Sequence, residues 1–324
     1  MFRDFRPLPL LRNPHVQTIL AVLLNDWQRA MSARRRLVRL PDGDRLQLFD
    51  SCPRTWAPGR PVVLLVHGLS GCHRSGYLVR LARLLLPCGM RVLRMDLRGA
   101  GASMHLARST YNAACSGDVR TAAAAILRWC PGSPLALVGF SLGGNIVLKL
   151  AGEAAARPLP GLIAVAAVNP PIDLEASCAM LSRPPNRFYD RFFARQLSKQ
   201  ALQHVELFPD LPRPSFPRNM TLRQFDELYT APRGGYADAL EYYRQASALP
   251  LVPRIALPTL ILSARDDPFV AVEPIAALQG AANLHIRLTD HGGHLGYLGA
   301  DGRGGIHWAE RHVAAWLTSM PALT

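Results

Sequence analysis

The sequence predicts an α/β fold in which a mostly parallel central sheet is covered by helices on both faces. The first observation is that short, continuous apolar runs alternate with helical stretches from residue 61 onward. Such runs are typical of parallel strands buried on both faces, and helices supply the crossovers that parallel strands need. The second is that 49% of the 324 residues are apolar, which is enough for one large core.

The elements follow from these patterns in chain order. Two strands flank a turn at 41–44, and the remaining strands are the continuous apolar runs. The expected strands are 36–40, 45–50, 61–66, 91–96, 135–140, 162–168, 259–264 and 284–289. The expected helices are 77–86, 117–129, 142–156, a stretch near 272–279, and 305–319.

The alternation stops after Asn169-Pro170-Pro171 and resumes at residue 259. In between, the chain is rich in proline and has aromatic and charged helical stretches such as 187–205 and 235–248. This composition indicates an insertion and not a continuation of the sheet. We therefore expect one domain over 1–324, with a helical cap inserted at approximately 174–253.

The composition limits which binding partners and which cellular compartment we expect. The formal net charge is +14, but the arginines are scattered and the dense run at 34–36 opens a strand. We expect no nucleic-acid partner, whereas a weak peripheral contact with anionic membrane surfaces would suit this charge. The six cysteines form no C-x-x-C pair, and no apolar run reaches eighteen residues. We therefore predict a cytoplasmic protein with reduced, partly buried thiols.

Gly139-Phe140-Ser141-Leu142-Gly143-Gly144 is the sharpest motif in the chain. It follows an apolar strand and opens an apolar helix, which is the context that the G-x-S-x-G pattern requires. A serine at such a tight strand-to-helix turn needs small residues two positions before and after it. Its hydroxyl is then presented beside a helix N-terminus, where negative charge is favoured. We predict that Ser141 is a nucleophile.

A serine nucleophile needs a base and a carboxylate that orients the base, and in this fold the three follow one another along the chain in the order Ser, Asp, His. The strand 259–264 is followed by Asp266 and Asp267, and we prefer Asp267 as the triad acid, with Asp266 supporting the turn. The strand 284–289 is followed by His291 and His294. Glycines flank His294, so we prefer it as the base, with His291 as the alternative. The final-helix residues His307 and His312 are expected to lie at the surface or half-buried.

The predicted oxyanion donors are two backbone N–H groups. One belongs to Leu142, directly after the serine, and the other to Leu69 in the loop His67-Gly68-Leu69-Ser70-Gly71. His67 is expected to orient that loop through a hydrogen bond. The glycine-rich turn at 98–103 fits neither phosphate-loop pattern, and the paired histidines lack a third ligand. We therefore expect no cofactor and no metal.

These motifs together resemble the α/β-hydrolase superfamily across nearly the whole chain, and more closely the YheT-like esterase family. The finer likeness rests on Asn13-Pro14-His15-Val16-Gln17-Thr18, the loop 67–71 followed by Ser75-Gly76-Tyr77, the turn 96–99, the elbow 139–145 and Asp266-Asp267-Pro268. The resemblance implies the triad Ser141, Asp267 and His294, and acyl-ester substrates of medium-chain or phospholipid type. Ser70 and Gly76 depart from the acidic residue and the proline that are frequent there.

The predicted function is therefore hydrolysis of carboxylic esters of small-molecule acyl substrates through an acyl-enzyme. Transfer of the acyl group to an alcohol is a second hypothesis, and a non-catalytic binding protein on the same fold is a third. Six aromatic residues of the cap either line an acyl pocket or pack its helices, and the sequence favours neither. They are Phe188, Tyr189, Phe192, Phe193, Tyr242 and Tyr243.

Overall fold

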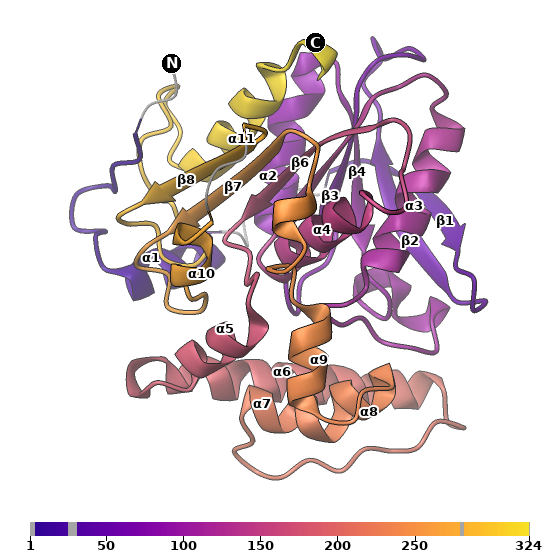
Figure 1. Ribbon diagram of the computed structural model, residues 1–324, viewed down its shortest axis with the longest axis vertical. Coiled ribbons are helices and arrows are strands. Elements are labelled where there is room, and N and C mark those ends of the chain that lie inside the picture. The colour runs from indigo at the N-terminus through magenta and orange to yellow at the C-terminus, as the bar shows by residue number, and fades with distance from the viewer. Residues whose placement is uncertain (1–3, 25–30, 279–281, 324) are drawn as a thin grey trace.

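The computed structural model describes residues 4–24, 31–278 and 282–323 (Figure 1). These residues form an eight-stranded sheet with the order β1-β2-β4-β3-β5-β6-β7-β8. The first hairpin pairs antiparallel and β2 also joins β4 antiparallel, while every pair from β4 to β8 is parallel. The strands are β1 Arg34–Arg39, β2 Arg45–Ser51, β3 Val62–Val66, β4 Arg91–Asp96, β5 Leu135–Phe140, β6 Leu162–Val168, β7 Thr259–Ala264 and β8 Leu284–Thr289. The predicted α/β-hydrolase fold is confirmed.

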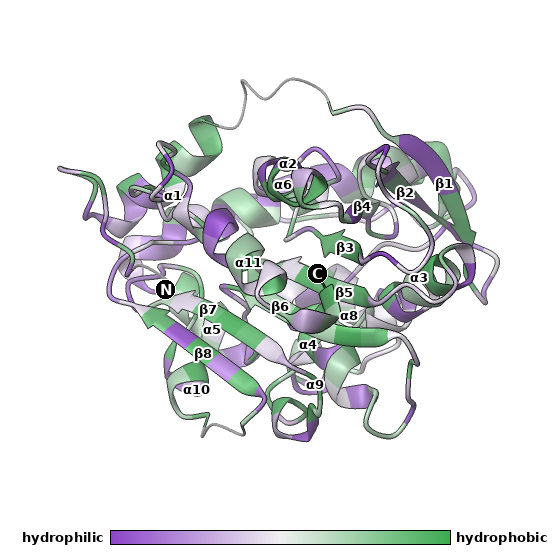
Figure 2. Cartoon of the chain, turned by 90° about the horizontal axis from the view of Figure 1, so that it is seen from above, coloured by the Kyte–Doolittle hydropathy of each residue, from purple (hydrophilic) through white to green (hydrophobic). Residues whose placement is uncertain are grey.

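Helices cover both faces of this sheet, and each face has its own core. Alternate residues of β3 divide between the two: Leu64 belongs to the core with α3 and α4, and Leu65 to the core with α2 and α11. Figure 2 shows β3 in the colour of hydrophobic residues, as burial on both faces requires. The helices of the α/β part are α1 Pro14–Leu23, α2 Gly76–Leu85, α3 Ser116–Trp129, α4 Leu142–Glu153, α10 Glu273–Ala276 and α11 Trp308–Thr318.

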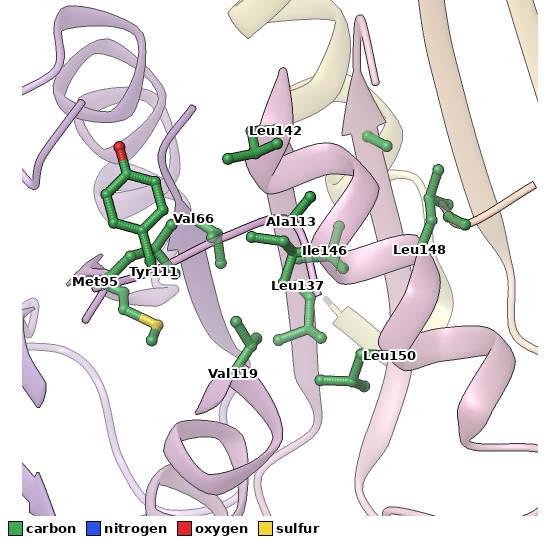
Figure 3. Packing of buried hydrophobic residues seen from close by; sticks show 14 of the residues in the cluster. Val66, Met95, Tyr111, Ala113, Val119, Leu137, Leu142, Ile146, Leu148 and Leu150 are labelled. Atoms are coloured by element: carbon green, nitrogen blue, oxygen red, sulfur yellow. The ribbon is translucent and has the colours of Figure 1, made fainter. Parts of the chain in front are cut away.

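The first of these cores supports the start of α4. Figure 3 shows Val66 of β3, Leu137 of β5 and Ile146 of α4 packed in one cluster. All three side chains are fully buried. Because buried apolar area of this kind contributes about 25 cal/mol per Å², the cluster fixes α4 firmly against the strands. The residue that precedes α4 is thereby held at the carboxyl ends of β3 and β5.

The segment between β6 and β7 is helical and lies below the α/β part in Figure 1. It consists of α5 Leu174–Leu181, α6 Arg187–Leu207, α7 Leu222–Phe225, a π-helical turn Asp226–Thr230, α8 Ala231–Gly234 and α9 Ala239–Ala246. It has a small core of its own, which includes Leu197, Met220 and Phe225. Polar contacts attach it to the α/β part, among them the bond from Asn145 Nδ2 to the carbonyl of Ala246.

Several details differ from the sequence-based expectations. Residues 14–23 form a helix that the sequence analysis did not assign. The expected helical stretch 235–248 is helical only over α9, and α10 is shorter than expected, with residue 279 outside the described range. Cys52 and Cys88 are exposed, contrary to the expectation of partly buried thiols. None of the described helices is long and apolar enough to cross a membrane.

His312 also differs from the sequence-based expectation, because it is buried. It is 8% exposed, and its ring stacks on that of Trp308 with 4.6 Å between the ring centroids. The sequence analysis had placed it at the surface or half-buried. Burial, with a smaller effect from Arg287, lowers the pKa of His312 to about 4. The imidazole is therefore neutral in the folded protein at neutral pH.

The pH dependence of folding should report this buried histidine. The folded-state pKa lies below the unfolded value of about 6.5, so the unfolded chain binds the proton first. The contribution of His312 is therefore complete above pH 6.5 and declines as the pH falls toward 4, by at most about 3 kcal/mol. We expect His312→Phe, which preserves the stacking, to flatten this decline in urea unfolding measured across that pH window.

His105 provides the matched control, because it is exposed. The variant His105→Phe should follow the wild-type curve between pH 6.5 and 4. Equal slopes for His312→Phe and the wild type would contradict a neutral, buried imidazole at position 312.

Candidate active site

Ser141 stands between β5 and α4 in a strained backbone conformation, with φ +51° and ψ −123°. The turn around it leaves no room for side chains. A Cβ on Gly139 would lie 2.1 Å from the carbonyl oxygen of Gly143, and one on Gly143 would lie 2.5 Å from that of His67. The N–H of Ser141 donates to the carbonyl of Val168 at 2.8 Å. Three neighbouring strands therefore fix the position of one half-buried hydroxyl.

The hydroxyl of Ser141 begins a chain of hydrogen bonds. Its Oγ lies 2.9 Å from Nε2 of His294, and Nδ1 of His294 lies 2.8 Å from Oδ2 of Asp267. A neutral imidazole whose Nδ1–H donates to the carboxylate leaves Nε2 free to accept the serine proton. The structure thus brings together the three residues that the sequence analysis selected.

Asp267 is buried, and its carboxylate is held by several donors. Oδ1 accepts the backbone N–H groups of Phe269 at 2.8 Å and Val270 at 3.2 Å, while Oδ2 also accepts Nδ2 of Asn169. Asn169 follows β6 with φ +46°, and it also donates to the carbonyl of Gly293. The sequence analysis did not assign Asn169 a role at the site, although its place after a buried strand was a signal.

Asp266 and His291 form a separate contact beside this chain. Their nearest atoms, Oδ2 and Nδ1, are 3.4 Å apart, and the side chain of His291 is 41% exposed. Asp266 Oδ1 accepts the N–H of Gly293 at 2.9 Å, while burial raises the pKa of its carboxyl group. Asp266 therefore supports the loop that carries His294.

The loop after β3 approaches Ser141 closely. A Cβ on Gly68 would lie 3.0 Å from Cβ of Ser141. The flanking N–H groups are taken, since Gly68 donates to the hydroxyl of Tyr77 and Ser70 to that of Tyr111. The N–H groups of Leu69 and Leu142 have no acceptor among the described residues. Two donors thus remain available beside the serine.

His67 orients this loop and is itself fully buried. The N–H of Leu97 donates to Nε2 at 3.1 Å, so Nδ1 carries the proton and donates to the carbonyl of Gly68 at 2.7 Å. Burial lowers the pKa of this imidazole, which agrees with a neutral ring. The expected orienting role of His67 is confirmed.

The N-terminal helix α1 holds the loop of His294. Asn13 caps the helix, and Thr18 Oγ1 accepts the N–H of His294 at 2.9 Å. Gln17 donates to the carbonyl of Leu298 and accepts its N–H. A Cβ on Gly293 would lie 2.4 Å from the carbonyl oxygen of Pro14, so helix and loop are in direct contact. The Asn13–Thr18 motif, noticed in the sequence only as a family resemblance, thus supports the loop of His294.

Two cavities open beside Ser141 and share Leu69, Phe193, Phe269 and His294 in their walls. The inner cavity, of about 110 Å³, lies toward α5, α9 and the π-helical turn. The outer groove, of about 630 Å³, runs between α1 and α6. Each of the six aromatic residues singled out in the sequence lines at least one of these spaces, and the rings also pack on neighbours, as Tyr189 does on Phe269 with 4.5 Å between ring centroids.

One group of metal-ligand type occurs within the described ranges, namely Cys72, His73 and Asp96. The sequence analysis did not notice it. None of the three lines a cavity beside Ser141. The carboxylate of Asp96 already accepts the N–H groups of His73 and Ala102 as well as the His73 ring. These hydrogen bonds connect the end of β4 to the neighbouring loops and give the cluster a structural role.

The fold and the site have the arrangement of an α/β hydrolase. The sheet is mostly parallel, a serine elbow follows β5, a carboxylate follows β7 and a histidine follows β8. Residues 61–301 match the family model of the alpha/beta hydrolase fold. Over 98% of its length the chain is 33% identical to YheT of Escherichia coli (strain K12), a protein named as an esterase, and it covers 93% of that protein. The chain belongs to the α/β-hydrolase fold family and, within it, to the YheT-like esterases.

Other relatives and solved structures agree with this assignment. A monoacylglycerol lipase of Saccharomyces cerevisiae is 27% identical over 88% of this chain, which spans 63% of that enzyme. The mouse phospholipase ABHD3 is 27% identical over 82% of this chain and is covered to 66%. A solved 2,6-dihydroxy-pseudo-oxynicotine hydrolase shares the fold with a TM-score of 0.59 and 18% identity, over 93% of this chain and 70% of its own. A solved Pyrococcus furiosus esterase also shares the fold, with a TM-score of 0.57 and 14% identity. The match covers 98% of this chain and 99% of that esterase.

The close approach at the elbow yields a stability prediction. In Gly139→Ala the new methyl group would meet the backbone of Gly143 at 2.1 Å, and backbone atoms cannot move aside cheaply. We expect a loss of about 3 kcal/mol or more in the free energy of unfolding, measured with urea.

Gly117 is the matched control, because a Cβ there meets nothing within 4 Å and its φ is not positive. It lies in the first turn of α3, so Gly117→Ala should leave stability unchanged or raise it by up to about 1 kcal/mol. Similar stabilities for the two variants would contradict the close approach.

Proposed function

We propose that this protein is a serine hydrolase that cleaves carboxylic esters of acyl substrates through an acyl-enzyme. The observation that carries the proposal is the hydrogen-bond chain from Ser141 through His294 to Asp267 at the meeting point of two largely apolar cavities. A nucleophile, a base and an orienting carboxylate are the groups that acyl transfer needs. The esterase and lipase names of the relatives support the same reaction class.

In the first half-reaction, Nε2 of His294 takes the proton of Ser141 while Oγ attacks the ester carbonyl. The buried carboxylate of Asp267 stabilises the imidazolium that forms. Breakdown of the tetrahedral intermediate transfers this proton to the departing alcohol and leaves the acyl group on Oγ. A water molecule that gives its proton to His294 then attacks the acyl carbonyl, and the acid is released with Ser141 restored.

The oxyanion of each tetrahedral intermediate is stabilised by the N–H groups of Leu69 and Leu142. Support comes from their lack of acceptors among the described residues and from the short distance between Gly68 and Ser141. Leu142 is also the first residue of α4, whose N-terminus favours negative charge. Donors fixed in this way need no reorganisation when the charge develops.

We propose that residues 174–253 act as a cap that divides the substrate between the two cavities. The inner cavity is lined by Leu174, Leu181 and Leu197 and takes the acyl chain, of medium length or lipid-like. The outer groove is lined by Phe188 and Phe192 and takes the alcohol portion, which leaves by that route. With both portions of the ester bound in this way, the carbonyl carbon between them is shielded from bulk water.

The groove also opens on a surface suited to a peripheral membrane contact. Around it α1 exposes Val22 (62%) and Leu23 (55%), and α6 exposes Phe188 (52%). Arg187, Arg191, Arg195 and Lys199 recur every fourth residue along α6, and none of them makes an ion pair within the described part of the chain. Exposed apolar groups beside unpaired cations favour an anionic lipid surface.

Replacing the nucleophile tests the reaction. Ser141→Ala removes the attacking oxygen, so we expect complete loss of labelling by a fluorophosphonate probe. Hydrolysis of a panel of p-nitrophenyl acyl esters should fall by about 10⁴-fold or more, with the circular dichroism spectrum retained. Absence of both labelling and hydrolysis in the wild type would end the proposal.

Adjacent aspartates give a matched pair within the same experiment. Asp267→Asn should lower kcat by about 10³- to 10⁴-fold, because the amide no longer holds the required tautomer of His294. Asp266→Asn should cost less than about tenfold, since the hydrogen bonds of that side chain within the described residues go to Gly293 and His291. The reverse order of effects would assign the triad acid to Asp266.

The membrane contact is tested by sedimentation with vesicles of phosphatidylserine and phosphatidylcholine. Each basic residue near an anionic surface contributes about 1 kcal/mol, so Arg191→Glu with Arg195→Glu should weaken binding about 25-fold or more. Arg54→Glu with Arg60→Glu, on the exposed loop before β3, changes the net charge equally and should have a much smaller effect. Equal losses would attribute the binding to net charge and not to α6.

A further inference from the structure

The wall of the inner cavity on the side of α5, α9 and the π-helical turn is polar, although most of the cavity is apolar. Ser177 of α5, Tyr243 of α9, and Asp226 and Thr230 of the π-helical turn all line it. Ser141 and His294 line the same cavity. A space suited to an acyl chain thus combines the reacting serine with a group of hydrogen-bonding side chains that the mechanism does not use.

Ser177 is the first sign that this polar wall accommodates a ligand. Its side chain is buried, at 6% exposure, and its Oγ has no hydrogen-bond partner among the described residues. Burying a hydroxyl without a partner costs about 1–3 kcal/mol, so such groups are rare in folded proteins. A polar group of a ligand in the cavity would relieve that cost.

Asp226 is the second sign. Its carboxylate accepts the hydroxyl of Tyr243 at 2.8 Å and a hydrogen bond from the side chain of Thr230, and the Tyr243 hydroxyl also lies 3.3 Å from Sγ of Cys178. No cation pairs with Asp226 within the described residues. Burial raises the pKa of this carboxyl group to about 6. The group therefore retains acceptor capacity that a donor in the cavity would satisfy.

The local backbone also indicates a functional position. Asp226 begins a π-helical turn that ends at Thr230 and separates α7 from α8. Such turns frequently occur at functional sites, because the wider helix changes the direction in which side chains project. Here it places both Asp226 and Thr230 in the wall of the cavity.

We propose that the inner cavity selects acyl chains that carry a hydroxyl group toward their far end, with Ser177 and Asp226 as the specificity-determining residues. The inference rests on the proposed ester hydrolysis and names its substrate class more narrowly. The hydroxyl of the acyl chain donates to the carboxylate of Asp226 and accepts from Oγ of Ser177. The apolar side chains that line the rest of the cavity contact the intervening methylene groups.

The test compares pairs of p-nitrophenyl esters at pH 8. Each pair consists of a hexanoyl, octanoyl or decanoyl ester and its ω-hydroxy counterpart, so that only the terminal group differs. At the chain length that spans the cavity, we expect the ω-hydroxy ester to have a kcat/KM about tenfold higher, which is the size of one net hydrogen bond. A ratio at or below one at every length would overturn the inference.

The variants Ser177→Ala and Asp226→Leu should each reduce that ratio to within about threefold of one. Because both esters are measured on the same preparation, the ratio does not depend on the fraction of folded protein. Ser177→Ala removes only one oxygen, so it decides the question even where Asp226→Leu does not fold. Retention of the tenfold preference in Ser177→Ala and in folded Asp226→Leu would also overturn the inference.

Asp190→Asn is the matched control, because Asp190 is a buried aspartate of α6 that accepts the N–H of Leu222 and does not line the inner cavity. It should lower both rates together and leave their ratio unchanged. Failure of the proposed function has a different signature, since neither ester of any pair would then be cleaved and the fluorophosphonate probe would not label Ser141.

Discussion

The site depends on the close approach of three backbone segments beneath Ser141. The strained turn costs about 1–3 kcal/mol, and it persists because β3, β5 and β6 leave it no alternative. Gly143 lies against the carbonyl oxygens of Val66 and His67, and the N–H of Ser141 is bound to Val168. Side chains at these glycines would separate the strand ends from α4. The serine hydroxyl is therefore exposed to substrate only as long as the backbone contacts of the sheet are intact.

The histidine has a different kind of support. His294 lies in a loop and not in a strand or helix, so its place depends on contacts with other segments. Thr18 of α1 and Asn169 after β6 bind this loop from two directions. Helix α1 lies outside the range 61–301 that matches the general hydrolase family, yet the likeness to YheT covers 98% of the chain. The support of the histidine loop by α1 therefore comes from a part of the chain outside the range that matches the general family.

The sequence predicted most accurately those elements that local constraints determine. The strands 135–140, 259–264 and 284–289 have the predicted bounds, because each is an apolar run that ends at a turn. The elbow was recognisable from the sequence because the tight turn around Ser141 requires glycines at fixed positions close to the serine. Asn169 and Thr18 were not assigned roles, since their importance arises from contacts with residues more than one hundred positions away. The polar wall around Asp226 was missed because its residues come from three separate helical segments, whose packing the sequence pattern does not reveal.

Phe269 links the chemistry of the triad to the shape of the cavities. Its N–H donates to Asp267, its ring lies 4.5 Å from the ring of His294, and it lines both cavities. The same residue therefore orients the carboxylate and shields the bond between Asp267 and His294 from water. Shielding strengthens that interaction, because the effective dielectric is lower in an apolar environment. In the proposed mechanism, an acyl chain that fills the inner cavity would extend this shielding, so substrate binding would strengthen the interaction that orients His294 toward Ser141.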